Sequence, residues 1–127
     1  MSDKIKLMRP NVGEEALELV REVIDSGMLV EGKMVHEFED TVKSYTGANY
    51  ATACTSATTG LELALRALKV GPGDEVIVPD FTHPATALVV KTVGAEPVLV
   101  DVELSSYNTT ADKMEEAISD KTKVIMP

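Results

Sequence analysis

The segment Cys54–Gly60, with the sequence CTSATTG, carries four hydroxyl side chains among small residues, between an apolar run and a helical pattern. Free backbone N–H groups at a helix start, the positive end of the helix dipole and nearby hydroxyls together bind anions such as phosphate. Thr55 or Ser56 would serve equally well as a plain helix cap, so this loop alone leaves both interpretations open. Neither G-x-x-x-x-G-K-[ST] nor G-x-G-x-x-G occurs in the chain, which disfavours nucleoside triphosphates and nicotinamide cofactors.

A second loop with polar and ring side chains runs over residues 79–86, with the sequence PDFTHPAT. It follows an apolar strand pattern, and Pro84 suits the first turn of a helix. From its type and place alone, His83 is interpreted as a surface or capping residue. Asp101 follows the next strand pattern, and we expect it to stabilise its own loop through hydrogen bonds to the backbone.

The chain contains two histidines and one cysteine, with no Ser/His/Asp set and no metal-ligand spacing. A self-contained hydrolase or metalloenzyme is therefore disfavoured, and no metal is expected. Cys54 lies in a strand-like run of small residues, and we expect it to be a buried apolar filler. His36 is assigned no role.

Two helices and then alternating strands and helices would position these loops. Apolar residues at spacings of three and four predict a helix that ends at Gly27 and another that ends at Gly47. From residue 48 onward the pattern is typical of βαβ units. The expected strands are Tyr50–Cys54, Glu75–Val78, Pro97–Val100 and Lys123–Met126, and the expected helices cover residues 58–69, 84–93 and 111–119.

Four strands joined by right-handed crossovers predict an α/β fold with a mainly parallel sheet between two helical layers. Ligands of such sheets bind beyond the carboxyl ends of the strands, which places the expected site at residues 55–60, 79–84 and 101–107.

The composition restricts the partners. The 127 residues carry 12 Lys and Arg against 21 Asp and Glu, a net charge of −9, with no cluster of basic residues. Binding to nucleic acid or to an anionic membrane surface is therefore not expected. The first thirty residues contain neither an apolar signal core nor a membrane span, so we expect a cytoplasmic protein.

Motifs along nearly the whole chain resemble the start of the nucleotide-sugar aminotransferases that use pyridoxal phosphate (PLP), the DegT/DnrJ/StrS family. The similar stretches are DSG at 25–27, Val35 to FE at 38–39, YTG at 45–47, SATTGLELALRAL at 56–68, GPGDEVIVP at 71–79, THPATA at 82–87, GAEPVLVDV at 94–102 and KTKVI at 121–125. The resemblance implies the aspartate-aminotransferase fold of type I, with residues 1–47 as an N-terminal helical segment and residues 48–127 as part of the large PLP-binding domain, truncated at its C-terminus.

The resemblance also implies roles for particular residues. Ser56, Ala57 and Thr58 match the family's phosphate loop, and His83 matches the position whose ring stacks on the pyridine. Ala57 stands where glycine is usual, so a positive φ there would strain the backbone. Met28 and Val30 match a segment that lines the substrate site.

In the family, a lysine that forms a Schiff base with PLP and an aspartate that pairs with the pyridine nitrogen come later in the chain than residue 127. None of the nine lysines here matches that position, so we expect no catalytic residue in this chain and no transamination by it alone. The parent enzyme would transfer an amino group, with glutamate as the expected donor, to a nucleotide-linked keto-sugar used in polysaccharide, lipopolysaccharide or antibiotic synthesis.

We expect a homo-oligomer, because a partial sheet exposes an edge and an uncovered face. Two alternatives remain open at this stage. One is a sugar dehydratase of the same family, in which histidine replaces the lysine. The other is a non-catalytic module that binds a phosphate-bearing ligand through the Thr58 loop.

Overall fold

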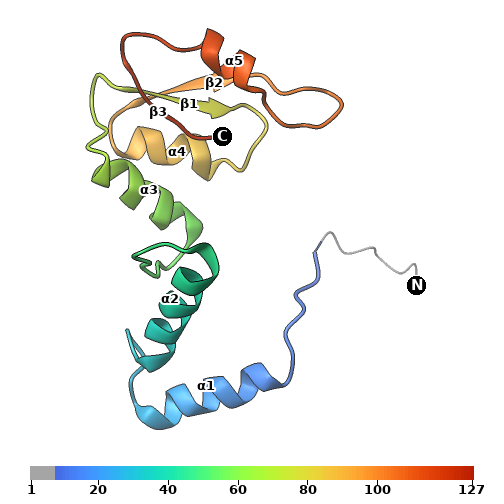
Figure 1. Ribbon diagram of the computed structural model, residues 1–127, viewed down its shortest axis with the longest axis vertical. Coiled ribbons are helices and arrows are strands. Elements are labelled where there is room, and N and C mark those ends of the chain that lie inside the picture. The colour runs from blue at the N-terminus through green and yellow to red at the C-terminus, as the bar shows by residue number, and fades with distance from the viewer. Residues whose placement is uncertain (1–7) are drawn as a thin grey trace. The chain divides into compact units, whose positions relative to one another are not determined.

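A computed structural model describes residues 8–127 (Figure 1). The chain divides into two compact units, Met1–Ala53 and Cys54–Pro127.

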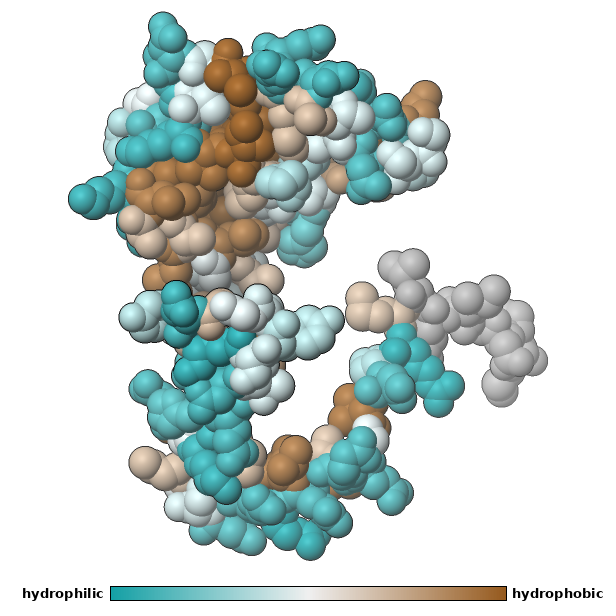
Figure 2. Space-filling model, in the orientation of Figure 1, coloured by the Kyte–Doolittle hydropathy of each residue, from teal (hydrophilic) through white to brown (hydrophobic). Residues whose placement is uncertain are grey.

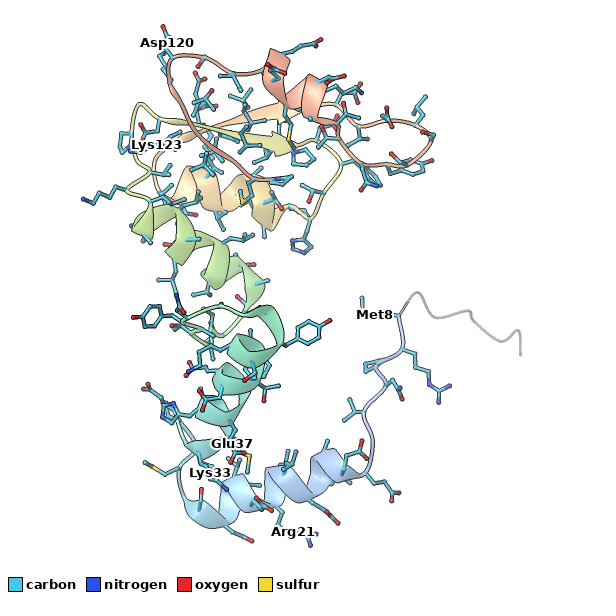
Figure 3. The ribbon with its side chains drawn as sticks, in the orientation of Figure 1. Met8, Arg21, Lys33, Glu37, Asp120 and Lys123 are labelled. Carbon is cyan, nitrogen blue, oxygen red and sulfur yellow. The ribbon has the colours of Figure 1, made fainter. Side chains whose placement is uncertain are left out.

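The first unit contains the two expected helices, α1 (Glu15–Ser26) and α2 (Lys33–Thr46). Each ends at a glycine in the left-handed conformation: Gly27 has φ 70° and Gly47 has φ 72°. Glycine adopts this conformation without steric cost, which is why it so often follows the last turn of a helix. Both predicted helix ends are therefore confirmed. Lys33 and Glu37, labelled in Figure 3, form an ion pair along the exposed side of α2 at 3.3 Å.

The second unit is a three-stranded parallel sheet with helices on both faces. Its elements in chain order are α3 (Ala57–Ala67), β1 (Glu75–Pro79), α4 (Ala85–Thr92), β2 (Glu96–Val100), α5 (Ala111–Glu116) and β3 (Thr122–Ile125). The strand order is β2-β1-β3, so β1 is the central strand. The predicted α/β class and its parallel sheet are confirmed.

The expected strand Tyr50–Cys54 is wrong, because these residues form no strand in the structure. Its side chains after Tyr50 are small and offer little apolar area to a sheet face, and the segment pairs with none of β1 to β3. The backbone N–H of Ala53 instead donates to Oε1 of Glu39 on α2, at 2.8 Å. That hydrogen bond is the largest cause of a lowered pKa at Glu39. Cys54 is consequently exposed and not the buried filler expected from its neighbours.

Successive side chains of β1 point to opposite faces of the sheet, and each face carries its own apolar core. Val76 and Val78 pack with Leu65 of α3 and with Val89 and Val90 of α4. Ile77 points to the opposite face, where it packs with Val100 and with Met114 of α5. All three β1 side chains are fully buried. The chain therefore forms the predicted three layers, with α3 and α4 on one side of the sheet and α5 on the other (Figure 1).

The edge strands leave apolar side chains in solvent. Leu99 on β2 is 60% exposed and Ile125 on β3 is 42% exposed, because each edge strand has only one neighbour. Figure 2 shows apolar surface over the second unit.

Lys123 of β3, labelled in Figure 3, forms hydrogen bonds at the amino end of the sheet. Its ammonium donates to the carbonyl of Lys69 at 2.7 Å and to Oδ2 of Asp74 at 3.1 Å. Oδ2 of Asp74 also accepts from the Gly71 N–H at 2.9 Å. The Gly71 hydrogen bond and then Lys123 hold the pKa of the Asp74 carboxyl below its ordinary value. The carboxylate thus links the turn before β1 to β3.

Candidate functional site

Two of the three candidate loops lie at the carboxyl edge of the sheet. The strands β1 and β2 end at Pro79 and Val100, and the segments that follow them are the second and third loops identified from the sequence. The N–H of Asp80 donates to the carbonyl of Val100 at 3.0 Å, which joins the starts of these two loops. Figure 1 shows α4 running in the opposite direction to β1, so its N-terminal end lies at this edge, whereas the N-terminal end of α3 lies away from the sheet.

Ser56 is the N-cap of α3. Its backbone is extended, with φ −162° and ψ 162°, and its Oγ accepts from the N–H of Thr59 at 3.2 Å. The hydroxyl of Thr59 lies 3.1 Å from Oγ of Ser56 and 3.2 Å from the hydroxyl of Thr55. Three of the four hydroxyls in this loop therefore serve to close the helix start, and the capping interpretation holds for Ser56.

Ala57 and Thr58 provide the donors that the cap leaves open. Across residues 8–127, neither of their backbone N–H groups has a hydrogen-bond partner, and the Thr58 hydroxyl has none. The first turn of α3 contains no acidic side chain. Two N–H groups and one hydroxyl are thus free to bind an anion at the positive end of the helix dipole. The Ser56 cap and a candidate anion site can share one loop, because they use different donors.

The backbone at Ala57 is helical. Non-glycine residues with positive φ are Glu31, Lys69 and Tyr107 within the described part of the chain, and Ala57 is not among them. The substitution of alanine for the family's usual glycine therefore introduces no left-handed strain.

His83 begins the turn into α4. Its Nδ1 accepts from the N–H of Ala85 at 3.1 Å, and its carbonyl accepts from the N–H of Thr86 at 2.9 Å. The hydroxyls of Thr82 and Thr86 lie 3.2 Å apart across the same turn. Because Nδ1 is an acceptor, the neutral ring carries its proton on Nε2. His83 is exposed, so it caps α4 through one ring nitrogen while its ring remains accessible.

The third loop begins at Asp101, whose Oδ1 accepts from the N–H of Val102 at 2.9 Å. The expected loop-stabilising role of Asp101 is confirmed. Sequence reasoning missed another feature, the contact between the rings of Phe81 and Tyr107, whose centroids lie 5.4 Å apart. Nothing in the spacing of the two residues indicates this contact, because it depends on β1 and β2 being neighbours.

Met28 and Val30 lie in the first unit, between α1 and α2. Met28 is 61% exposed and lines a cleft of about 230 Å³ between the two helices, together with Leu29 and Met34. Val30 is 80% exposed and is not part of that lining.

Metal-binding side-chain clusters and membrane-spanning helices are both absent from residues 8–127. No group of three or more His, Cys, Asp or Glu side chains is placed to hold a metal ion there. None of the described helices is both long enough and apolar enough to cross a membrane.

The parallel sheet and its helices match the α/β fold of fold-type-I aminotransferases. Residues 10–127 match the DegT/DnrJ/EryC1/StrS aminotransferase family, and the chain belongs to that family. Aminotransferases of this family use PLP.

Solved structures agree with the assignment. A Streptococcus pneumoniae protein assigned as a sugar aminotransferase is 41% identical, with a TM-score of 0.90 over 97% of this chain and 31% of its own. It has been solved in apo, PLP and PMP forms. The aminotransferase TlmJ of Streptoalloteichus hindustanus is 34% identical, with a TM-score of 0.86 over 96% of this chain and 34% of its own.

A 3-amino-5-hydroxybenzoic acid synthase is 36% identical, with a TM-score of 0.86 over 93% of this chain and 31% of its own. The chain spans about a third of the length of each of these relatives.

Proposed function

We propose that this chain supplies the phosphate-binding and ring-stacking part of the PLP site of an aminotransferase whose amino acceptor is a nucleotide-linked keto-sugar. The observation that carries the proposal is the pair of open N–H groups at Ala57 and Thr58, beside the free Thr58 hydroxyl. The chain carries a net charge of −9, so a phosphate dianion must be held by local donors and not by the general field of the protein.

The residues present fit PLP. The terminal oxygens of its phosphate accept hydrogen bonds, and Ala57 and Thr58 together offer three donors. Its flat pyridine ring can stack on an accessible aromatic face, and the His83 imidazole is exposed and oriented by the Ala85 N–H. When bound, PLP supplies the electron sink on which amino-group transfer depends. The chain's own contribution is to bind the phosphate and to orient the ring.

The keto-sugar acceptor is supported by the Streptococcus pneumoniae relative, which is assigned as a sugar aminotransferase. Glutamate as the amino donor and the lining of the sugar site by Met28 and Val30 belong to the same proposal. We assign no catalytic residue to this chain, and we expect it to show no keto-sugar-dependent turnover by itself. Turnover measured with the 127-residue chain and both substrates would contradict that expectation.

Titration of the chain with PLP, followed by absorbance and by equilibrium dialysis, tests the binding site. We expect saturable binding that Thr58→Ala weakens by about threefold to tenfold, because one hydroxyl donor to a charged oxygen is lost while both N–H groups remain. Thr92→Ala, at the C-terminal end of α4, is the matched control and should leave the dissociation constant unchanged. Equal affinity of the wild type and Thr58→Ala would remove Thr58 from the site.

The mode of binding is tested with the same samples. None of the chain's lysines is assigned to PLP, so we expect noncovalent binding: dialysis should remove the cofactor, and borohydride should leave the mass of the chain unchanged. A mass increase after borohydride treatment would reveal a lysine that reacts with PLP.

Association with further copies is also part of the proposal, because apolar side chains on both edge strands of the sheet lie in solvent. Light scattering should show a mass above 13.6 kDa for the chain in solution. A clean monomer across the concentration range would contradict self-association and leave the cofactor site unaffected.

A further inference from the structure

The ring contact between Phe81 and Tyr107 joins two loops of the second unit. Phe81 follows β1 and Tyr107 follows β2, so the contact bridges the segments beyond two neighbouring strands. The ring centroids are 5.4 Å apart and the ring planes are tilted by 42°. Tilted pairs at this separation are favourable arrangements for aromatic side chains.

The backbone of Tyr107 is held in an uncommon conformation. Its φ is 56°, in the left-handed region that a bulky residue rarely occupies. The surrounding loop maintains this conformation: the Tyr107 N–H donates to the carbonyl of Glu103 at 2.8 Å, and the Glu103 N–H donates to the carbonyl of Asn108 at 2.9 Å. The Asn108 N–H also donates to Oγ of Ser106 at 3.2 Å. A closed loop therefore presents the Tyr107 ring.

The loop that carries Phe81 is fixed at its two ends. The Asp80 N–H donates a hydrogen bond to the carbonyl of Val100, and the Ala85 N–H donates one to Nδ1 of His83. Between these points, Phe81 contacts the ring of Tyr107 in the neighbouring loop, although 64% of Phe81 and 58% of Tyr107 remain exposed. His83 is two residues after Phe81, so a shift of Phe81 would be passed along the short segment to the imidazole.

We propose that Tyr107 is a positioning residue for His83: its ring holds Phe81 and so fixes the loop that presents the imidazole. The benefit to cofactor binding rests on the function proposed above, whereas the effect on the His83 ring does not. A residue from the loop after β2 thus sets the geometry of a ring in the loop after β1.

The test compares Tyr107→Ala, Tyr107→Phe and Tyr107→Gly by NMR of the two histidine rings and by PLP titration. For Tyr107→Ala we expect shifted His83 ring signals, unchanged His36 signals and PLP binding weakened by about threefold to tenfold, the range of one aromatic pair. Tyr107→Phe keeps the ring and should match the wild type within about twofold.

Tyr107→Gly separates the ring from the backbone. Glycine relieves the positive φ, so a purely structural role for Tyr107 would make this variant behave like the wild type or better. The positioning role requires that it shift the His83 signals as Tyr107→Ala does. Should Tyr107→Ala unfold the chain, Phe81→Leu removes the same ring pair from the other side and must produce the same His83 shifts.

Unchanged His83 signals in either Tyr107→Gly or Phe81→Leu would overturn the proposal. Failure of the wild-type chain to bind PLP would overturn the proposed function instead, while the response of the His83 signals without cofactor would still decide the role of Tyr107.

Discussion

Replacing Ala57 by proline should weaken PLP binding by about tenfold to a hundredfold while α3 stays helical. Ala57 is the first residue of α3, and proline is well tolerated at that position because its missing N–H has no partner within the helix. The preceding Ser56 already has the extended backbone that a residue before proline prefers. The substitution therefore removes one phosphate donor, and a hydrogen bond to a charged group contributes about 1.5–3 kcal/mol.

The control for this variant is Ala57→Gly, which retains the N–H and should change the dissociation constant little. Circular dichroism of both variants checks that the helical content is preserved. If Ala57→Pro binds PLP as tightly as Ala57→Gly does, the N–H of residue 57 is not a phosphate donor. Together with Thr58→Ala, the pair tests backbone and side-chain donors of the same loop separately.

Replacing Ile77 by alanine should lower the free energy of unfolding by about 2–5 kcal/mol, as expected for a large aliphatic residue removed from a core. Ile77 is fully buried on the central strand, and its side of the sheet has a small core in which it packs with Val100 and Met114. With α5 only six residues long, that side has few other apolar groups to close the cavity. Urea unfolding followed by circular dichroism gives the difference between the variant and the wild type.

Ile125→Ala is a matched control, because Ile125 is the β3 partner of Ile77 in the parallel register. The same atoms are removed from a position that is 42% exposed on an edge strand, so a loss of about 1 kcal/mol is expected. Equal losses at the two positions would show that the edge of β3 is covered in solution, which would in turn support self-association.

The helices and three of the four expected strands follow from local patterns. The ends of α1 and α2 were predictable because Gly27 and Gly47 provide a conformation that other residues adopt only with strain. The strand β1 was predictable because its apolar run is bounded by a glycine-rich turn and a proline. The segment Tyr50–Cys54 has a strand-like sequence and forms no strand. A strand needs a neighbouring strand to pair with, and the pattern of residues within one segment does not specify that neighbour.

Some features of the candidate site also follow from local sequence, whereas others do not. The Ser56 cap and the open donors of Ala57 and Thr58 depend on one helix start, so the sequence of that loop was enough to indicate them. The capping bond from the Ala85 N–H to His83 is also local, since it spans two residues. The proposed stacking role of His83 rests on the family resemblance, and the structure adds the hydrogen bond that orients the ring.

The sequence by itself determined the α/β class, the positions of most elements and the helix start that is proposed to bind a phosphate, because periodicity and helix capping act over a few neighbouring residues. Only the tertiary structure decided the strand order β2-β1-β3, the absence of a strand at Tyr50–Cys54 and the contact between Phe81 and Tyr107. These features depend on which segments become neighbours in space, and that choice is made by packing the two faces of β1, not by any short stretch of the chain.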